Sequence, residues 1–113
     1  METQGNDNES VSKAPGAAAG GKVLLATHSR KGNATLPLKG GARTDLLSVQ
    51  FNCQGKGGGT VSVEPIGMEF PVTCVEHQVN STYHEIRLKR PRAEAEIRVT
   101  APSTVRWALT AEQ

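Results

Sequence analysis

Aromatic residues are scarce in this chain of 113 residues, which contains two Phe, one Tyr and one Trp. Hydrophobic residues make up 36% of the chain, enough for one domain with a modest core. Long apolar runs are also missing, and no window approaches the roughly 18 residues of a membrane-spanning helix. Residues 1–6 lack the basic and apolar regions of a signal peptide. We therefore expect a soluble chain without a targeting segment.

The chain also has little net charge, with 13 basic and 11 acidic side chains and a formal charge of +2. This is too small to indicate nucleic-acid binding. The acids are unevenly placed, because Glu2, Asp7 and Glu9 lie in the first 12 residues. The remaining residues hold 13 basic and 8 acidic groups, so they carry +5.

Residues 1–21 are rich in Gly, Ala, Asn and Ser, and Val11 is their only large aliphatic residue. Such a segment cannot bury enough apolar surface to offset the entropy lost on ordering. The composition predicts a disordered polar linker over residues 1–21 and one folded domain over residues 22–113.

Helical periodicity is absent from this domain, and alternation with a period of two replaces it. Residues 47–54 show it best, with Leu47, Val49, Phe51 and Cys53 on one face and polar side chains on the other. The same alternation recurs at Val61 and Val63, at Met68, Phe70, Val72 and Cys74, at Ala93, Ala95, Ile97 and Val99, and at Val105, Trp107, Leu109 and Ala111. The pattern predicts an all-β fold, an antiparallel β-sandwich of seven to eight strands that is immunoglobulin-like or jelly-roll-like.

Two details of strand arrangement can be predicted. Residues 23–29 and 34–39 form two shorter strands, and Pro37 suits an edge strand. A turn at Arg90-Pro91 would form a hairpin that sets Ile86 opposite Ala95 and Arg87 opposite Glu94, a register in agreement with the hydrophobic phase.

Cys53 and Cys74 both lie on the inward phase and both end a strand at the same end of the domain. In a flat three-stranded meander they would be roughly 9 to 10 Å apart, whereas a disulfide needs Cα atoms about 4.4 to 6.8 Å apart. We predict a disulfide between the two sheets, with the chain changing sheets at residues 65–67. The alternative is a pair of buried reduced thiols. The disulfide would imply an oxidising compartment.

The polar start followed by a β domain is typical of a bacterial lipoprotein whose signal peptide and lipidated first cysteine have been replaced by an initiating Met. Residues 46–57 (LLSVQFNCQGKG), 70–74 (FPVTC) and 99–110 (VTAPSTVRWALT) resemble a group of small actinobacterial secreted or lipid-anchored proteins of uncharacterised function. The resemblance covers residues 22–113. It implies a β-sandwich and an extracytoplasmic location, but no catalytic or binding residue.

Catalytic and metal-binding patterns are missing. The run 55–60 lacks the spacing of a phosphate loop and is followed by a strand. His28, His77 and His84 lie on separate stretches without the companions of a triad or a metal site. We expect no enzyme activity, no cofactor and no metal; a small enzyme is the less favoured alternative.

The only local concentration of charge is Arg87, Lys89, Arg90 and Arg92. A solvated hairpin tip is the simplest interpretation, and an anionic contact surface is the functional one. Nucleic acid is not expected, because Tyr83 is the only nearby outward aromatic. Carbohydrate binding is an alternative, weakened because Phe51, Phe70 and Trp107 are on inward phases.

The sequence therefore predicts a monomeric, non-catalytic, extracytoplasmic module, associated with the cell envelope through a lipid anchor or secreted. Its partner would be a protein or an envelope component.

Overall fold

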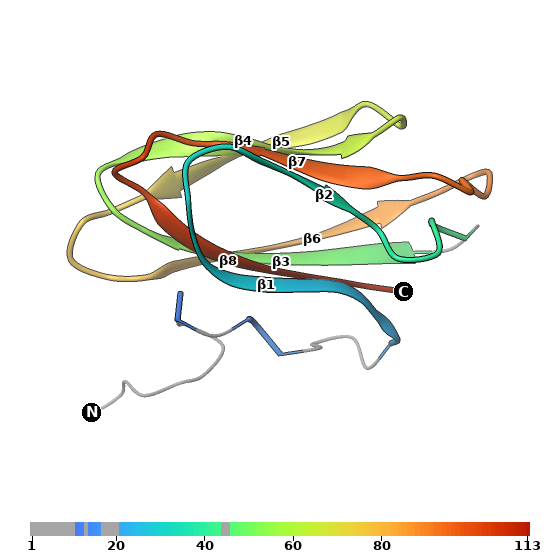
Figure 1. Ribbon diagram of the computed structural model, residues 1–113, viewed down its shortest axis with the longest axis horizontal. Helices are drawn as coiled ribbons and strands as arrows, with labels where there is room; N and C mark the ends of the chain where they lie inside the picture. The colour runs from blue at the N-terminus through green and yellow to red at the C-terminus, as the bar shows by residue number, and fades with distance from the viewer. Residues whose placement is uncertain (1–10, 13, 17–20, 44–45) are drawn as a thin grey trace.

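The computed structural model describes residues 11, 12, 14–16, 21–43 and 46–113, and its regular structure consists of β-strands (Figure 1). The strands are β1 (Val23–Lys31), β2 (Ala34–Pro37), β3 (Leu46–Gln54), β4 (Gly57–Glu64), β5 (Met68–Cys74), β6 (Asn80–Arg87), β7 (Glu96–Thr100) and β8 (Arg106–Glu112). In this part of the chain, no helix is long and apolar enough to cross a membrane.

The strands form two four-stranded antiparallel sheets that pack face to face (Figure 1). Sheet 1 has the order β1-β8-β3-β6, and sheet 2 has the order β2-β7-β4-β5. This order is that of an eight-stranded jelly roll. The predicted all-β sandwich is confirmed, as is the edge position of the strand that contains Pro37.

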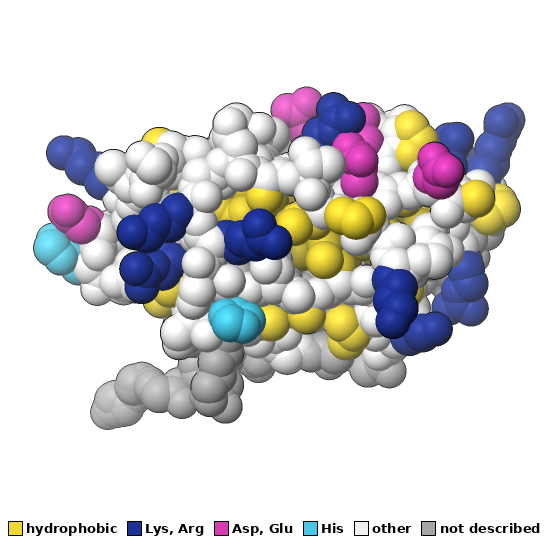
Figure 2. Space-filling view, viewed as in Figure 1, with side chains coloured by type: hydrophobic (Ala, Val, Ile, Leu, Met, Phe, Trp, Pro, Cys, Tyr) yellow, Lys and Arg dark blue, Asp and Glu magenta, His cyan; other side chains and the backbone are white. Residues whose placement is uncertain are grey.

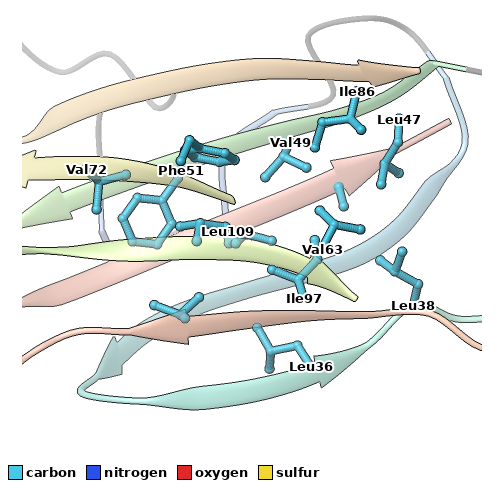
Figure 3. Packing of buried hydrophobic residues seen from close by; sticks show 14 of the residues in the cluster. Leu36, Leu38, Leu47, Val49, Phe51, Val63, Val72, Ile86, Ile97 and Leu109 are labelled. Carbon is cyan, nitrogen blue, oxygen red and sulfur yellow. The ribbon is translucent and has the colours of Figure 1, made fainter. Parts of the chain in front are cut away.

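The core lies between the sheets and is built from inward phases that the alternation predicts, except that Met68 and Ala93, which were expected to face inward, are exposed (Figure 3). Leu47, Val49 and Phe51 of β3 are fully buried, as are Val61 and Val63 of β4. Burying a side chain of this size stabilises a fold by about 1.5 to 3 kcal/mol. The stability of this small core therefore depends on the nearly complete burial of a few large side chains.

The predicted disulfide is confirmed: Cys53 of β3 is bonded to Cys74 of β5, with their Cα atoms 5.6 Å apart, and it joins the two sheets. The expected place of the sheet change is wrong. Residues 65–67 form the turn between β4 and β5 of the same sheet, and the chain changes sheets between β3 and β4. Gly55 permits that crossing, because its φ is 139° and a Cβ there would lie 2.2 Å from the Thr104 carbonyl oxygen.

The predicted hairpin around Arg90-Pro91 is also wrong. β6 pairs with β3, and β7 pairs with β2 and β4, so the connection over residues 88–95 crosses from sheet 1 to sheet 2. Arg87 lies opposite Leu46, and Glu94 is not in a strand. Ile86 and Ala95 are nevertheless both buried, because inward-facing residues of either sheet reach the same core.

The outer face of sheet 1 carries buried polar residues next to the N-terminal segment. Thr110 of β8 is 2% exposed, and its hydroxyl donates a 2.6 Å hydrogen bond to the Pro15 carbonyl oxygen. Ser29 in β1 donates its N–H to the Val11 carbonyl oxygen at 2.8 Å. Val11 and Pro15 are buried. Both residues belong to the linker predicted over residues 1–21, of which residues 1–10, 13 and 17–20 lie outside the described residues, and the linker stays a prediction.

Candidate functional site

The predicted contact residues Arg87, Lys89, Arg90 and Arg92 lie where β6 leaves sheet 1. The connection that carries them is held at Leu88 and at Arg92. Leu88 is 3% exposed and belongs to the core. Arg92 and Ala42 exchange backbone hydrogen bonds of 2.7 and 2.8 Å. Because its backbone is held by these contacts, the connection presents its cations on a fixed frame rather than on a free loop.

The four cations line a pocket of about 330 Å³ together with Ile66, Met68 and Leu88. These seven residues are called the basic corner below. Ile66 and Met68 come from the turn between β4 and β5 and from the start of β5, so sheet 2 supplies part of the apolar lining. Figure 2 shows Lys and Arg side chains at the end of the molecule where Figure 1 places this turn and the β6-to-β7 connection.

The described lining of this pocket contains no carboxylate. The expected partner Glu94 lines a different pocket, and Glu85 accepts a 3.0 Å hydrogen bond from the Tyr83 hydroxyl. Between described residues, ion pairs join only Arg98 to Glu96 and His77 to Glu76. The basic corner therefore has no carboxylate partner in that part of the chain.

A second pocket, of about 490 Å³, is lined partly by the last residues of the same connection and includes Glu64, Glu94, Glu96 and Arg98. Arg98 Nε lies 2.6 Å from Glu96 Oε2. This hydrogen bond and the charge of Glu96 raise the pKa of Arg98 above its usual value. The pocket therefore holds an internal ion pair, whereas the basic corner does not.

A third pocket, of about 400 Å³, lies at the opposite end of the strands and includes Lys31, Arg106 and Glu76. The glycine-rich run beside it forms the start of β4. Its backbone is already in use, since Gly55 N–H bonds to the Val75 carbonyl and the Thr104 hydroxyl bonds to the Lys56 carbonyl. The cations here share their pocket with a carboxylate.

The three histidines are far from forming one site. His28 is exposed on β1, and the His77 side chain is 93% exposed. His84 is half-buried, and its ring stacks on Phe70 with 3.8 Å between centroids. Among the described residues, no group of three or more His, Cys, Asp and Glu side chains is placed to hold a metal ion.

The aromatic side chains follow their predicted phases. Phe51 and Trp107 are fully buried and stacked at 5.6 Å, and Phe70 is 7% exposed. Tyr83 is 43% exposed on β6, where its hydroxyl also lies 3.2 Å from Ser48 Oγ. One exposed ring is a small platform for a sugar.

Comparison with known protein families, with curated proteins and with solved structures finds no match to this chain.

The sequence pattern predicts the cations of the basic corner but not its apolar residues. Ile66 and Met68 are about 20 residues away in sequence, and only the packing of the sheets brings them beside Leu88. One signal was present: Ile66 is a large apolar residue between Pro65 and Gly67, where a turn needs none.

Proposed function

We propose that this chain is a non-catalytic module that works outside the cytoplasm, secreted or held by an N-terminal lipid anchor, and that binds anionic lipid surfaces through the basic corner. The observation that carries the proposal is the set of four cations without a described carboxylate partner. Opposite charges within the protein would neutralise such a set, whereas an external anion would be attracted to it.

The compartment is supported by the disulfide, which is compatible with an oxidising environment outside the cytoplasm. The sequence resemblance to actinobacterial secreted or lipid-anchored proteins would place the chain in the same compartment and is part of this proposal. A lipid anchor would complement the basic corner, since a single acyl chain binds membranes only marginally and stable attachment needs a second signal such as a basic patch.

The electrostatic attraction is weak and depends on salt. Each cation near an anionic membrane contributes about 1 kcal/mol, and the effect falls off within a Debye length of about 8 Å at physiological salt. A second membrane signal or a specific pocket is therefore needed for firm binding.

Co-sedimentation with anionic and with neutral vesicles tests this function. We expect binding to anionic vesicles at low salt, and loss of binding near 1 M salt, where the Debye length is about 3 Å. Reversal of Arg87, Lys89, Arg90 and Arg92 to Glu should abolish it.

The matched control reverses four exposed cations at the opposite end, Arg30, Lys31, Lys56 and Arg106, and changes the net charge equally. Binding should largely survive in this control. Equal loss in both variants would show that net charge, not the basic corner, causes binding, and absence of binding to anionic vesicles would refute the proposed function.

Carbohydrate binding is the second candidate, favoured by one observation: Tyr83 is exposed beside polar Ser48 and Glu85 on a jelly-roll sheet, a fold that also occurs in lectin domains. Glycan-array binding that is lost in Tyr83→Ala but kept in the reversed corner variant would favour it over lipid binding.

A further inference from the structure

The basic corner differs from an ordinary basic patch because three apolar side chains line the same pocket as its cations. Leu88 is buried, Ile66 is partly buried and packs against the core, and Met68 is 49% exposed. Cations that only attract a charged surface have no need of a recess between them. A pocket of about 330 Å³ that is lined by both cationic and apolar side chains matches the two-part character of an amphiphile.

The types of cation in the basic corner favour phosphate as the bound anion. Three of the four are arginines, whose planar guanidinium groups bind phosphate oxygens in pairs, and Lys89 adds a point charge. The backbone pair between Arg92 and Ala42 and the buried Leu88 hold the connection in place before any ligand binds. Less ordering entropy is then lost on binding than with a free loop.

We infer that the basic corner binds one phosphate-bearing lipid, with the phosphate at Arg87, Lys89, Arg90 and Arg92 and the methylenes of its chain against Ile66, Met68 and Leu88. This inference rests on the proposed function and adds a ligand class to it. Charge complementarity selects the anionic headgroup, and the exposed Met68 contacts the methylenes that lie farther from the phosphate than a four-carbon chain reaches.

Soluble probes separate the two parts of this site. Calorimetric titration would compare octyl phosphate, butyl phosphate and inorganic phosphate, each below its micelle concentration, with octyl glucoside as the uncharged probe. We expect octyl phosphate to bind about tenfold more tightly than butyl phosphate, because each buried methylene contributes about a fourfold gain in affinity and only some are buried. Octyl glucoside should not bind measurably.

Met68→Gln should remove most of the difference between octyl and butyl phosphate while leaving butyl phosphate binding unchanged, since it removes apolar contact and no charge. The matched control is Val75→Gln, an exposed apolar residue outside the pocket. It should retain the tenfold preference. Circular dichroism of both variants would confirm that they are folded.

The outcomes distinguish the two proposals. Equal affinity for the octyl and butyl probes, or no phosphate binding while anionic vesicles still bind, would overturn the lipid pocket and leave the proposed function standing. Failure of vesicle binding as well would overturn both. Binding of octyl glucoside as tight as octyl phosphate would also overturn the inference, because the cations would then play no part.

Discussion

Trp107 shows how the few large residues of this chain are used. It is fully buried, stacks on Phe51, and donates a 3.0 Å hydrogen bond from Nε1 to the Gly32 carbonyl oxygen. The indole thus fills the core and also satisfies a backbone acceptor in the turn between β1 and β2. The Trp107 side chain therefore links the core to the turn between β1 and β2, which crosses from sheet 1 to sheet 2.

Replacing Trp107 with Ala should destabilise the protein by about 3 to 5 kcal/mol, because the cavity left by the ring cannot close fully. Trp107→Phe should cost less, since it keeps the ring contact with Phe51 and loses only the N–H. Urea unfolding measures both. Because Trp107 is the only Trp, its emission in the native protein should be blue-shifted and poorly quenched by iodide; readily quenched emission would contradict its burial.

Thr110 has a similar double role on the other face of sheet 1. Its hydroxyl is buried and bonds to the Pro15 carbonyl oxygen. Thr110→Val keeps the shape of the side chain but removes its hydroxyl donor, so the Pro15 carbonyl oxygen loses this hydrogen bond. We expect the free energy of unfolding to fall by about 1 to 2 kcal/mol. Thr100→Val, at an exposed position of β7, is the matched control and should change unfolding little. Equal effects in both variants would show that the contact with Pro15 does not stabilise the fold.

At the scale of elements, the alternation of side chains predicted the strands well because it is a local property. Hydrophobic residues in every second position show which face of a strand is buried, and the inward positions of β3, β4 and β8 agree with this. The alternating hydrophobic residues do not show which strand lies beside which. Ile86 and Ala95 face the core whether β6 and β7 pair with each other or lie in different sheets. The same hydrophobic alternation is therefore compatible with both the predicted hairpin and the observed crossing.

The site of the sheet change was missed for a related reason. Residues 65–67 and residues 55–56 both have turn composition, and the sequence contains no signal that separates a turn within a sheet from a crossing between sheets. The cysteines required a crossing somewhere between them. In the structure it lies beside Gly55, where the close approach to Thr104 demands glycine.

The disulfide is the one covalent link between β3 and β5, and it closes a loop with a sequence separation of 21. Replacing both Cys53 and Cys74 with Ala should destabilise the domain by about 2 to 5 kcal/mol, because the unfolded chain gains loop entropy. Chemical denaturation with and without reductant should show the same difference for the native protein. Alkylation of both thiols without reductant would disprove the link.

At the scale of the whole molecule, charge is distributed unevenly over an elongated body with a longest extent of 41 Å. The basic corner lies at one end, the pocket with Lys31, Arg106 and Glu76 at the other, and the pocket with Glu64, Glu94 and Glu96 beside the corner. At physiological salt the Debye length is about 8 Å, much shorter than the molecule. An anionic surface would therefore be attracted to the local charge of one end rather than to the net charge of +2.

At low salt the net charge of the whole chain should influence vesicle binding, whereas at physiological salt the local charge of the basic corner should dominate. The triple variant Glu2→Gln, Asp7→Asn and Glu9→Gln removes the acids of the N-terminal segment and raises the net charge from +2 to +5. At about 0.01 M salt the Debye length is about 30 Å, so these acids oppose attraction by the corner, and the variant should bind anionic vesicles about threefold more tightly. At physiological salt the gain should be smaller, because screening then weakens charge–charge interactions beyond about 8 Å. A gain of similar size at both salt concentrations would contradict this prediction, because it would mean that the acids act at the binding surface itself. As a control, the same three substitutions in the corner-reversed variant should produce no vesicle binding at either salt concentration.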